Sequence, residues 1–218
     1  MIVTQDDETI DQILSSVESI CKKYPEKYWL ELDKAQSYPT EFVKSMTESG
    51  HLNALIPTKY GGAGLSLLIA ARILEKIHQS GCNAAAAHAQ MYTMGSILKY
   101  GSEAQKSKWL PLIAKGEVRL QAFGVSEPEA GTDTSSISTT AIRKENKYIL
   151  NGQKIWTSRA LHSDLMILLA KTKSKNERNS KSDGLSLFLI DIRESLGSGM
   201  TIRPIETMIN HSTTEVFF

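Results

Sequence analysis

The sequence predicts an α+β fold in which an all-helical domain, residues 1–117, precedes a domain of antiparallel strands, residues 118–218, that is barrel-like or sandwich-like. Before residue 117, apolar residues recur every three or four positions, as on one face of a helix. After it, apolar and polar residues alternate, as along a half-buried strand. Helices followed by a run of strands, without βαβ alternation, indicate segregated α and β layers.

Several helices are expected in the first domain. Apolar residues at helical spacing predict a helix over residues 10–21 and, with weaker periodicity, another over 26–36. Residues 39–50 carry proline near a helix start and glycine just past its end. Ser66 is placed to cap a further helix that stops before Gly81. Residues 83–100 are apolar on several faces, which predicts a buried central helix, and residues 102–116 form the last one.

The second domain contains a series of candidate strands. They cover residues 119–125, 138–143, 147–150, 154–158, 164–170, 185–190, 200–204 and 214–218. Asn151 and Gly152, between the third and the fourth, form the strongest short hairpin signal in the chain. The last candidate strand is apolar and has no polar tail after it, which predicts that the chain is a fragment.

Composition excludes several classes of function. The chain has 218 residues with 25 Lys+Arg and 24 Asp+Glu, a net charge of +1, which gives no electrostatic argument for a nucleic-acid or anionic-membrane partner. The longest apolar run, residues 165–170, is too short to span a bilayer. The five histidines show no metal-ligand spacing, so we expect no metal. Two distant cysteines favour a reducing compartment, the cytoplasm, or the mitochondrial matrix if a transit peptide is missing.

Two segments have the residue types of a ligand site. Residues 121–133 leave a strand as a loop rich in Gly, Pro and hydroxyl groups, in which Gly131 permits positive φ. Such a loop can direct backbone N–H groups and hydroxyls at an acceptor-rich ligand. Residues 154–158 place the indole of Trp156 and the hydroxyl of Ser158 on one face of a strand, if the side chains alternate. Taken singly, each segment has an ordinary alternative. The first would be a turn without a ligand, and Trp156 of the second would be a residue of the hydrophobic core.

Taken together and in this order, the two segments resemble the signatures of the acyl-CoA dehydrogenase family. Residues 123–133 read FGVSEPEAGTD and residues 148–158 read YILNGQKIWTS. The family patterns are aromatic-x-V-T-E-P-x-A-G-S-D and N-G-x-K-x-W-I-T. Three flanking segments are similar to the family as well, so the resemblance covers nearly the whole chain: residues 60–64 (YGGAG), 101–111 and 214–218.

The resemblance implies a three-domain flavoenzyme, of which this chain resembles the helical and the middle β-domain. FAD is then expected to accept hydride from the β-carbon of an acyl-CoA thioester, giving trans-2-enoyl-CoA. By motif position, five residues would bind the flavin and one would lie near the CoA: Phe123, Val125, Ser126, Trp156 and Ser158 for the flavin, and Thr132 for the CoA. Ser126 would donate to the pyrimidine end of the flavin, Trp156 would pack on its ring, and Ser158 would donate to its N5.

No catalytic base is expected among the 218 residues. The resemblance places that glutamate in the C-terminal helical domain, and none of Glu127, Glu129 and Asp133 occupies its position. His88 and Tyr92 lie four residues apart on one helix face and fall where the family lines its acyl pocket. Their bulk suggests a short, branched or polar acyl group; the alternative is that both are ordinary buried residues.

The expected partners are an acyl-CoA substrate, an electron-transfer flavoprotein or similar acceptor, and further copies in a homodimer or homotetramer, with no nucleic acid and no membrane. Two alternatives stay open. Flavin monooxygenases and acyl-CoA oxidases resemble the same family and use oxygen. In a different class, the chain would be a truncated, non-catalytic module that binds a partner subunit.

Overall fold

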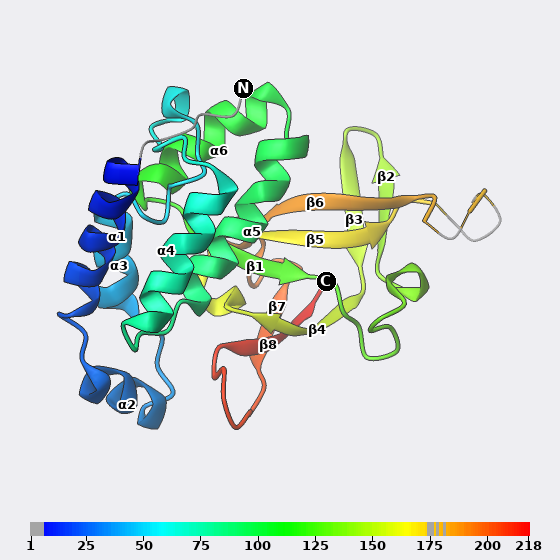
Figure 1. Cartoon of the computed structure of the whole chain (residues 1–218). Coiled ribbons are helices and arrows are strands. Elements are labelled where there is room, and N and C mark those ends of the chain that lie inside the picture. Colours follow the sequence, from blue (N-terminus) through cyan, green and yellow to red (C-terminus); the bar gives the residue numbers. More distant parts are fainter. Residues whose placement is uncertain (1–6, 174–176, 178, 181) are drawn as a thin grey trace. The chain divides into compact units, whose positions relative to one another are not determined.

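The chain divides into two units, Met1–Leu120 and Gln121–Phe218 (Figure 1). The structure, a computed structural model, describes residues 7–173, 177, 179–180 and 182–218. The first unit is helical and the second consists mainly of strands, so the predicted α+β class is confirmed. In the part of the chain that the structure describes, no helix is long and apolar enough to cross a membrane.

The helices of the first unit lie where the sequence predicts them. They are α1 (Asp7–Cys21), α2 (Glu26–Lys34), α3 (Thr40–Glu48), α4 (Leu67–Gln79), α5 (Ala85–Tyr100) and α6 (Glu103–Lys115). Ser66 begins α4 by accepting a hydrogen bond from the Ile69 N–H at 3.3 Å. Ser102 and Gln105 form a reciprocal capping box that begins α6, and Gly116 ends this helix with a left-handed backbone.

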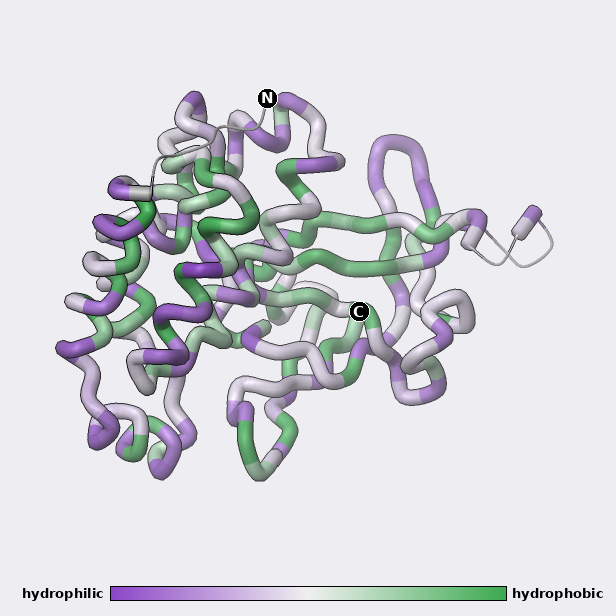
Figure 2. Tube along the Cα trace, in the orientation of Figure 1, coloured by the Kyte–Doolittle hydropathy of each residue, from purple (hydrophilic) through white to green (hydrophobic). Residues whose placement is uncertain are grey.

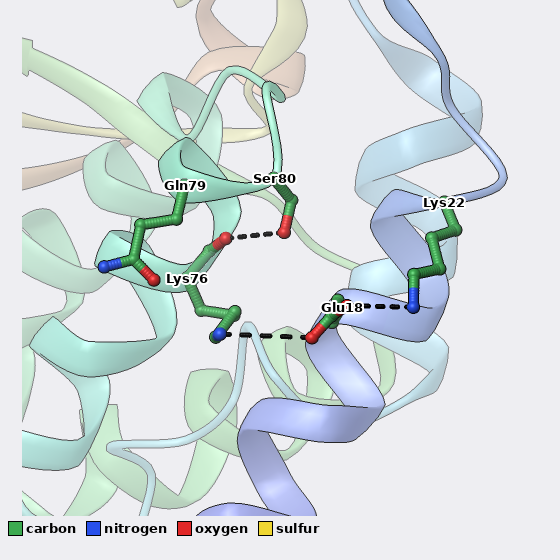
Figure 3. Close-up of a pocket in the computed structure, with 5 residues that line it drawn as sticks. All are labelled: Glu18, Lys22, Lys76, Gln79 and Ser80. Atoms are coloured by element: carbon green, nitrogen blue, oxygen red, sulfur yellow. Dashed lines mark hydrogen bonds and ion pairs between the residues drawn. The ribbon is translucent and has the colours of Figure 1, made fainter.

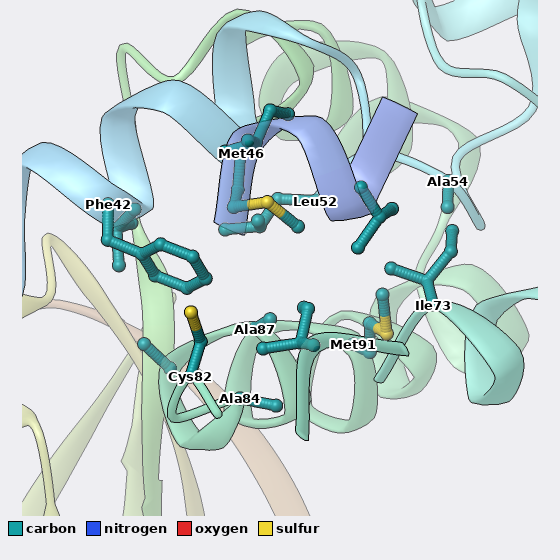
Figure 4. Packing of buried hydrophobic residues seen from close by; sticks show 14 of the residues in the cluster. Phe42, Met46, Leu52, Ala54, Ile73, Cys82, Ala84, Ala87 and Met91 are labelled. Carbon is teal, nitrogen blue, oxygen red and sulfur yellow. The ribbon is translucent and has the colours of Figure 1, made fainter. Parts of the chain in front are cut away.

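The core of the helical unit is formed by α1, α3, α4 and α5. Phe42 and Met46 of α3 pack with Ile73 of α4 and Met91 of α5 in one buried cluster (Figure 4). Half of the residues of α5 are buried, among them Ala86, Met91 and Ile97, so the burial predicted from its composition is confirmed.

Gly62, in the loop before α4, is required by a close backbone approach. A Cβ atom at this position would lie 2.1 Å from the carbonyl oxygen of Ile56. The same turn is closed by hydrogen bonds from Gly64 N–H to Ile56 O at 2.8 Å and from Leu65 N–H to Ala54 O at 2.7 Å. The YGGAG segment therefore has a structural role in this unit.

The described strands of the second unit form a five-stranded and a three-stranded sheet. They are β1 (Leu120–Gly124), β2 (Thr140–Lys144), β3 (Lys147–Asn151), β4 (Gln153–Ser158), β5 (Leu165–Lys171), β6 (Leu185–Asp191), β7 (Thr201–Pro204) and β8 (Thr213–Phe217), and a short helix, α7 (Ile192–Ser195), follows β6. The larger sheet has the order β1-β5-β2-β3 with β6 also paired to β5, and the smaller has the order β4-β8-β7. Figure 2 shows hydrophobic residues along β5 and β6, which pair with each other.

The larger sheet is mixed, so the prediction of a purely antiparallel domain is wrong in this respect. β2 pairs with β5 in parallel, at Thr140 and Lys171. β2–β3 and β5–β6 are antiparallel. The parallel pair is possible because the chain passes through β3 and β4 before it returns as β5, and parallel neighbours need such a long connection. Side-chain alternation indicates which face of a strand is buried and contains no information about the direction of its neighbour.

The hairpin prediction at Asn151 and Gly152 is also wrong. β3 and β4 belong to different sheets, and the tight turn lies one strand earlier, where Lys144 pairs with Lys147. At Gly152 the chain crosses from one sheet to the other. A Cβ atom there would lie 2.3 Å from the Oγ1 atom of Thr139, so glycine is required by close packing.

Replacing Gly62 with alanine is expected to destabilise the helical unit by about 3 kcal/mol, because the new Cβ atom overlaps backbone that cannot move cheaply. Gly95→Ala is the matched control. Gly95 lies inside α5, and a methyl group at this position would have no atom of its surroundings within 4 Å, so alanine should stabilise the helix by about 0.5–1 kcal/mol. Urea denaturation followed by circular dichroism measures both values. Equal effects of the two substitutions would contradict the close approach at Gly62.

Candidate functional site

A buried ion pair joins the two sequence motifs of the β unit. Lys154 Nζ of β4 lies 2.8 Å from Glu127 Oε1 in the loop after β1, and their side chains are 0% and 5% exposed. The same ammonium group donates to the Val125 carbonyl oxygen at 3.0 Å. A further bond runs from Ile155 N–H to the Ser126 carbonyl oxygen at 2.9 Å. Residues 125–127 and 154–155 are therefore held side by side.

The carboxylate of Glu127 also accepts hydrogen bonds from the backbone. The donors are the N–H groups of Ser138 and Thr139, the latter at 2.9 Å. Burial by itself would raise the pKa of Glu127, but the bonds from Lys154 and from these backbone groups outweigh it and lower the pKa below its ordinary value. Burial lowers the pKa of Lys154, and the ion pair partly offsets this. At neutral pH, Glu127 is thus an ionised group whose oxygens are engaged by the fold.

The acids around Glu127 have separate roles. Asp133 accepts hydrogen bonds from Ser135 N–H at 3.1 Å and from the Ser136 hydroxyl at 2.7 Å, which close the turn after the loop. Glu129 is exposed. Glu127 and Asp133 are therefore engaged in holding the loop.

β4 carries a β-bulge at Trp156. Its register with β8 shifts between Lys154 and Thr157, so two residues of β4 stand opposite one residue of β8. Trp156 has φ 60°, in the left-handed region that a bulky residue rarely adopts. Lys154 and Thr157 are both buried although they are three positions apart, whereas Trp156 is 59% exposed. The bulge interrupts the simple alternation from which Trp156 and Ser158 are expected to share a face, and regular pairing with β8 resumes at Thr157 and Ser158.

Ser158 pairs with Thr213 of β8, one position beyond the buried pair of Thr157 and Thr214. Its side chain therefore leaves the strand on the side opposite to Thr157. Its Oγ accepts a hydrogen bond from Asn210 Nδ2 at 2.9 Å. Within the described part of the chain, the hydrogen of this hydroxyl has no acceptor, and it is available to a ligand.

Backbone strain is concentrated around these side chains. Trp156, Arg159 and Asn210 all have φ between 58° and 62°. The Arg159 N–H donates to the Ser212 carbonyl oxygen at 2.7 Å, which ties the end of β4 to the loop before β8. Left-handed conformations of residues other than glycine cost free energy and persist where the surrounding structure enforces them, commonly at functional sites.

The loop after β1 provides the other predicted site residues. Phe123, Val125 and Ser126 are half-buried, and Thr132 is exposed. The φ of Gly131 is not positive, and no atom lies within 4 Å of the position of a Cβ, so neither conformation nor protein packing requires glycine there. Gly131 thus does not use the positive φ that glycine permits, and the open space beside it is compatible with the close approach of a ligand.

This arrangement suits a flat, acceptor-rich heterocycle. The exposed indole of Trp156 offers a planar apolar surface. Two residues further along, the hydroxyl of Ser158 accepts from Asn210 and can donate its own hydrogen to a ligand. The Ser126 hydroxyl, on the segment tied to β4, is a second candidate donor. A flavin has these features, and the residues present fit it. Across the described residues, no group of three or more His, Cys, Asp and Glu side chains could hold a metal ion.

The two predicted acyl-pocket residues lie in the helical unit. His88 and Tyr92 are both exposed on α5, and their ring centroids are 5.1 Å apart at an interplanar angle of 59°. The alternative that both are ordinary buried residues is therefore wrong. The two rings form one exposed aromatic surface on α5.

A groove of about 390 Å³ between α1 and α4 does not include the motif residues (Figure 3). It is lined by Glu18, Lys22, Lys76, Gln79 and Ser80. The Glu18 carboxylate lies 2.8 Å from Lys22 Nζ and 4.0 Å from Lys76 Nζ, and these are surface ion pairs. Such pairs contribute little free energy and form on many protein surfaces, so this groove is not a candidate active site.

Sequence reasoning missed Lys154 and Asn210 as parts of this site. Lys154 stands among apolar and aromatic residues in a strand, and an acid occurs in the preceding motif, which together are a detectable signal of a buried pair. Asn210 had no such signal. Its role depends on the return of the loop between β7 and β8 to Ser158 of β4, which is 52 residues away in the sequence.

Comparison with known proteins gives one consistent family. The profile of the acyl-CoA dehydrogenase N-terminal domain matches residues 7–117, and that of the acyl-CoA dehydrogenase middle domain matches residues 122–218. The chain is 35% identical over 192 residues to glutaryl-CoA dehydrogenase of Desulfococcus multivorans, covering 85% of this chain and 48% of that protein. It is 33% identical over 194 residues to a short-chain specific acyl-CoA dehydrogenase of Clostridium acetobutylicum, covering 86% and 49%.

A solved structure supports the same assignment. The acyl-CoA dehydrogenase of Geobacillus kaustophilus matches with a TM-score of 0.86 and 26% identity, over 100% of this chain and 57% of that chain. The chain thus spans about half the length of the curated relatives it matches.

Replacing Lys154 with methionine is expected to destabilise the β unit by about 3–5 kcal/mol, because the Glu127 carboxylate would stay buried without its counter-charge. Lys27→Met is the control, since Lys27 and Glu31 form an exposed pair at 3.8 Å whose loss should cost less than about 0.5 kcal/mol. The free energy of unfolding in urea distinguishes the two. If Lys154→Met costs no more than Lys27→Met, the ion pair does not stabilise the motif.

Thr157→Val is expected to stabilise the protein by about 1 kcal/mol. Thr157 Oγ1 is buried and has no hydrogen-bond partner among the described residues, and an unsatisfied buried hydroxyl costs free energy. Thr214→Val is the matched control, and it is expected to destabilise the protein. The Thr214 hydroxyl donates to the Thr157 carbonyl oxygen at 2.7 Å, so its loss should cost about 1 kcal/mol. Thermal denaturation of both variants tests this, and destabilisation by Thr157→Val would show that its hydroxyl is satisfied.

Proposed function

The chain belongs to the acyl-CoA dehydrogenase family, and we propose that its β unit binds FAD as part of an enzyme that converts an acyl-CoA thioester to the trans-2-enoyl-CoA. One observation carries the proposal. The two family motifs are joined by the Glu127–Lys154 pair, and the strand so held presents an exposed Trp156 and a Ser158 with a free donor.

Each residue has a distinct role in this proposal. Trp156 packs against the isoalloxazine ring, Ser158 donates to N5, and Ser126 donates to the pyrimidine end. Phe123 and Val125 contribute apolar surface beside the ring. When bound, FAD supplies the acceptor for the hydride that leaves the β-carbon. Donors fixed in advance stabilise charge that develops during the reaction without reorganising, and this is the contribution expected of both hydroxyls.

Thr132 is proposed to contact the CoA part of the substrate from the exposed part of the same loop. The α-proton must be removed by a carboxylate within reach of it. We expect that group to be none of Glu127, Glu129 and Asp133, since Glu127 is buried in an ion pair and Asp133 closes a turn. In the family this base belongs to the C-terminal domain, and no residue of this chain is proposed for it.

The helical unit is proposed to select the acyl group. The rings of His88 and Tyr92 form an exposed aromatic surface on α5, which would limit the length of an acyl chain that passes it. A short, branched or polar acyl group fits this surface best. An electron-transfer flavoprotein or similar acceptor, a homodimeric or homotetrameric assembly and a cytoplasmic location complete the proposal.

Flavin binding is tested by titrating the 218-residue chain with FAD and recording the visible spectrum and flavin fluorescence. Binding should perturb both signals, and Trp156→Ala should weaken the affinity by about 1–3 kcal/mol, since the stacking surface is lost. Tyr148→Ala is the control, because Tyr148 is a half-exposed aromatic residue of β3 outside the site. No binding by the wild type would contradict the proposal, as would equal losses in the two variants.

Acyl selection is tested by kcat/KM for a series of straight and branched acyl-CoA thioesters, measured under anaerobic conditions with a longer form of the protein that also supplies the catalytic base. Short or branched substrates should be preferred, and the double variant His88→Ala, Tyr92→Ala should raise kcat/KM for long chains about tenfold relative to short ones. A wild-type preference for long straight chains would show that these two side chains do not limit the pocket. Oxygen consumption in a parallel aerobic assay identifies an oxidase.

A further inference from the structure

We propose that Asn210 is a positioning residue, whose side-chain amide orients the Ser158 hydroxyl so that its hydrogen points out of the β unit toward N5 of the flavin. The inference rests on the proposed function and extends it to a residue outside both sequence motifs. It assigns a role to the loop between β7 and β8.

The hydrogen-bonding capacity of the two groups sets the direction of their contact. A serine hydroxyl has one hydrogen to donate and two lone pairs that accept. The amide nitrogen of Asn210 can only donate, and it does so to Ser158 Oγ at 2.9 Å. This bond occupies a lone pair and leaves the hydroxyl hydrogen for an acceptor on another side. Flavin N5 in the oxidised ring is such an acceptor.

The backbone around Asn210 is held firmly enough to fix this orientation. The Asn210 carbonyl oxygen accepts hydrogen bonds from Thr213 N–H at 3.0 Å, from Thr213 Oγ1 at 2.7 Å and from Thr207 Oγ1 at 3.3 Å. Asn210 itself has φ 58°, a conformation that asparagine tolerates better than most residues. These bonds hold the loop in the turn that returns the amide to β4.

The polarity of the side chain is the essential feature. An aspartate at position 210 would accept only, so the Ser158 hydroxyl would turn and donate to it, and its hydrogen would be lost to the flavin. Asparagine and aspartate have nearly the same shape. Asn210→Asp therefore reverses the direction of the hydrogen bond with little change in packing, and Asn210→Gly removes the side chain while suiting the positive φ.

The experiment compares the affinity of the 218-residue chain for FAD and for 5-deazaFAD, in which a C–H group that accepts no hydrogen bond replaces N5. The wild type should bind FAD about three- to tenfold more tightly than 5-deazaFAD. Asn210→Asp and Ser158→Ala should both bring this ratio close to one, and Asn210→Gly should lower it. The two ligands have the same charge, so the carboxylate introduced by Asn210→Asp changes both affinities by the same factor. This factor cancels in the ratio.

The outcomes separate this inference from the function on which it rests. A wild type that binds neither ligand overturns the proposed function and the inference with it. A wild type that binds both ligands equally, or an Asn210→Asp variant that keeps the wild-type ratio, overturns the inference while flavin binding stands. If Asn210 only stabilised the loop, its variants would lower the affinity for both ligands by the same factor and leave the ratio of the two affinities unchanged.

Discussion

The buried ion pair of Glu127 and Lys154 is the interaction on which the candidate site depends. It joins two segments that are 27 residues apart and belong to different strands and loops. A buried pair adds little net stability over an apolar pair of the same size, because both charges lose their hydration. Removing one partner alone is costly, however, so the pair specifies one arrangement of the two segments. That arrangement is what a binding surface built from a loop and a strand requires.

The positive φ of Trp156 occurs in the bulge that follows this anchor. Lys154 is fixed by the ion pair and Thr157 by its buried place opposite Thr214, and the chain must fit one residue too many between them. The bulge absorbs that residue and turns the indole of Trp156 outward. The loop between β7 and β8 returns to Ser158 and places Asn210 beside the hydroxyl. The fold thus stabilises locally unfavourable backbone in order to present one ring and one donor.

The sequence predicts the helices and the strand positions well because these depend on local periodicity and capping, as at Ser66 and Ser102. It fails where contacts between distant segments decide. The Asn151-Gly152 pair suggests a hairpin turn, but glycine is required at position 152 because Thr139 lies too close for a Cβ atom. The bulge at Trp156 depends on the register with β8, and no local pattern reveals it. The motif residues were identified through family resemblance, whereas the ion pair that holds them and the contact of Asn210 required the structure.

Residue-resolved amide hydrogen exchange of the wild type and Lys154→Met tests most directly whether the ion pair holds the site together. The relevant amides are those of Ser138 and Thr139, which donate to Glu127, and that of Ile155, which donates to Ser126. We predict that all three exchange faster in the variant, while the amides of α4 and α5 keep their wild-type rates, because only the β unit loses its anchor. Unchanged protection of these three amides would contradict the central role of the pair, since the two motif segments would then be held together without it.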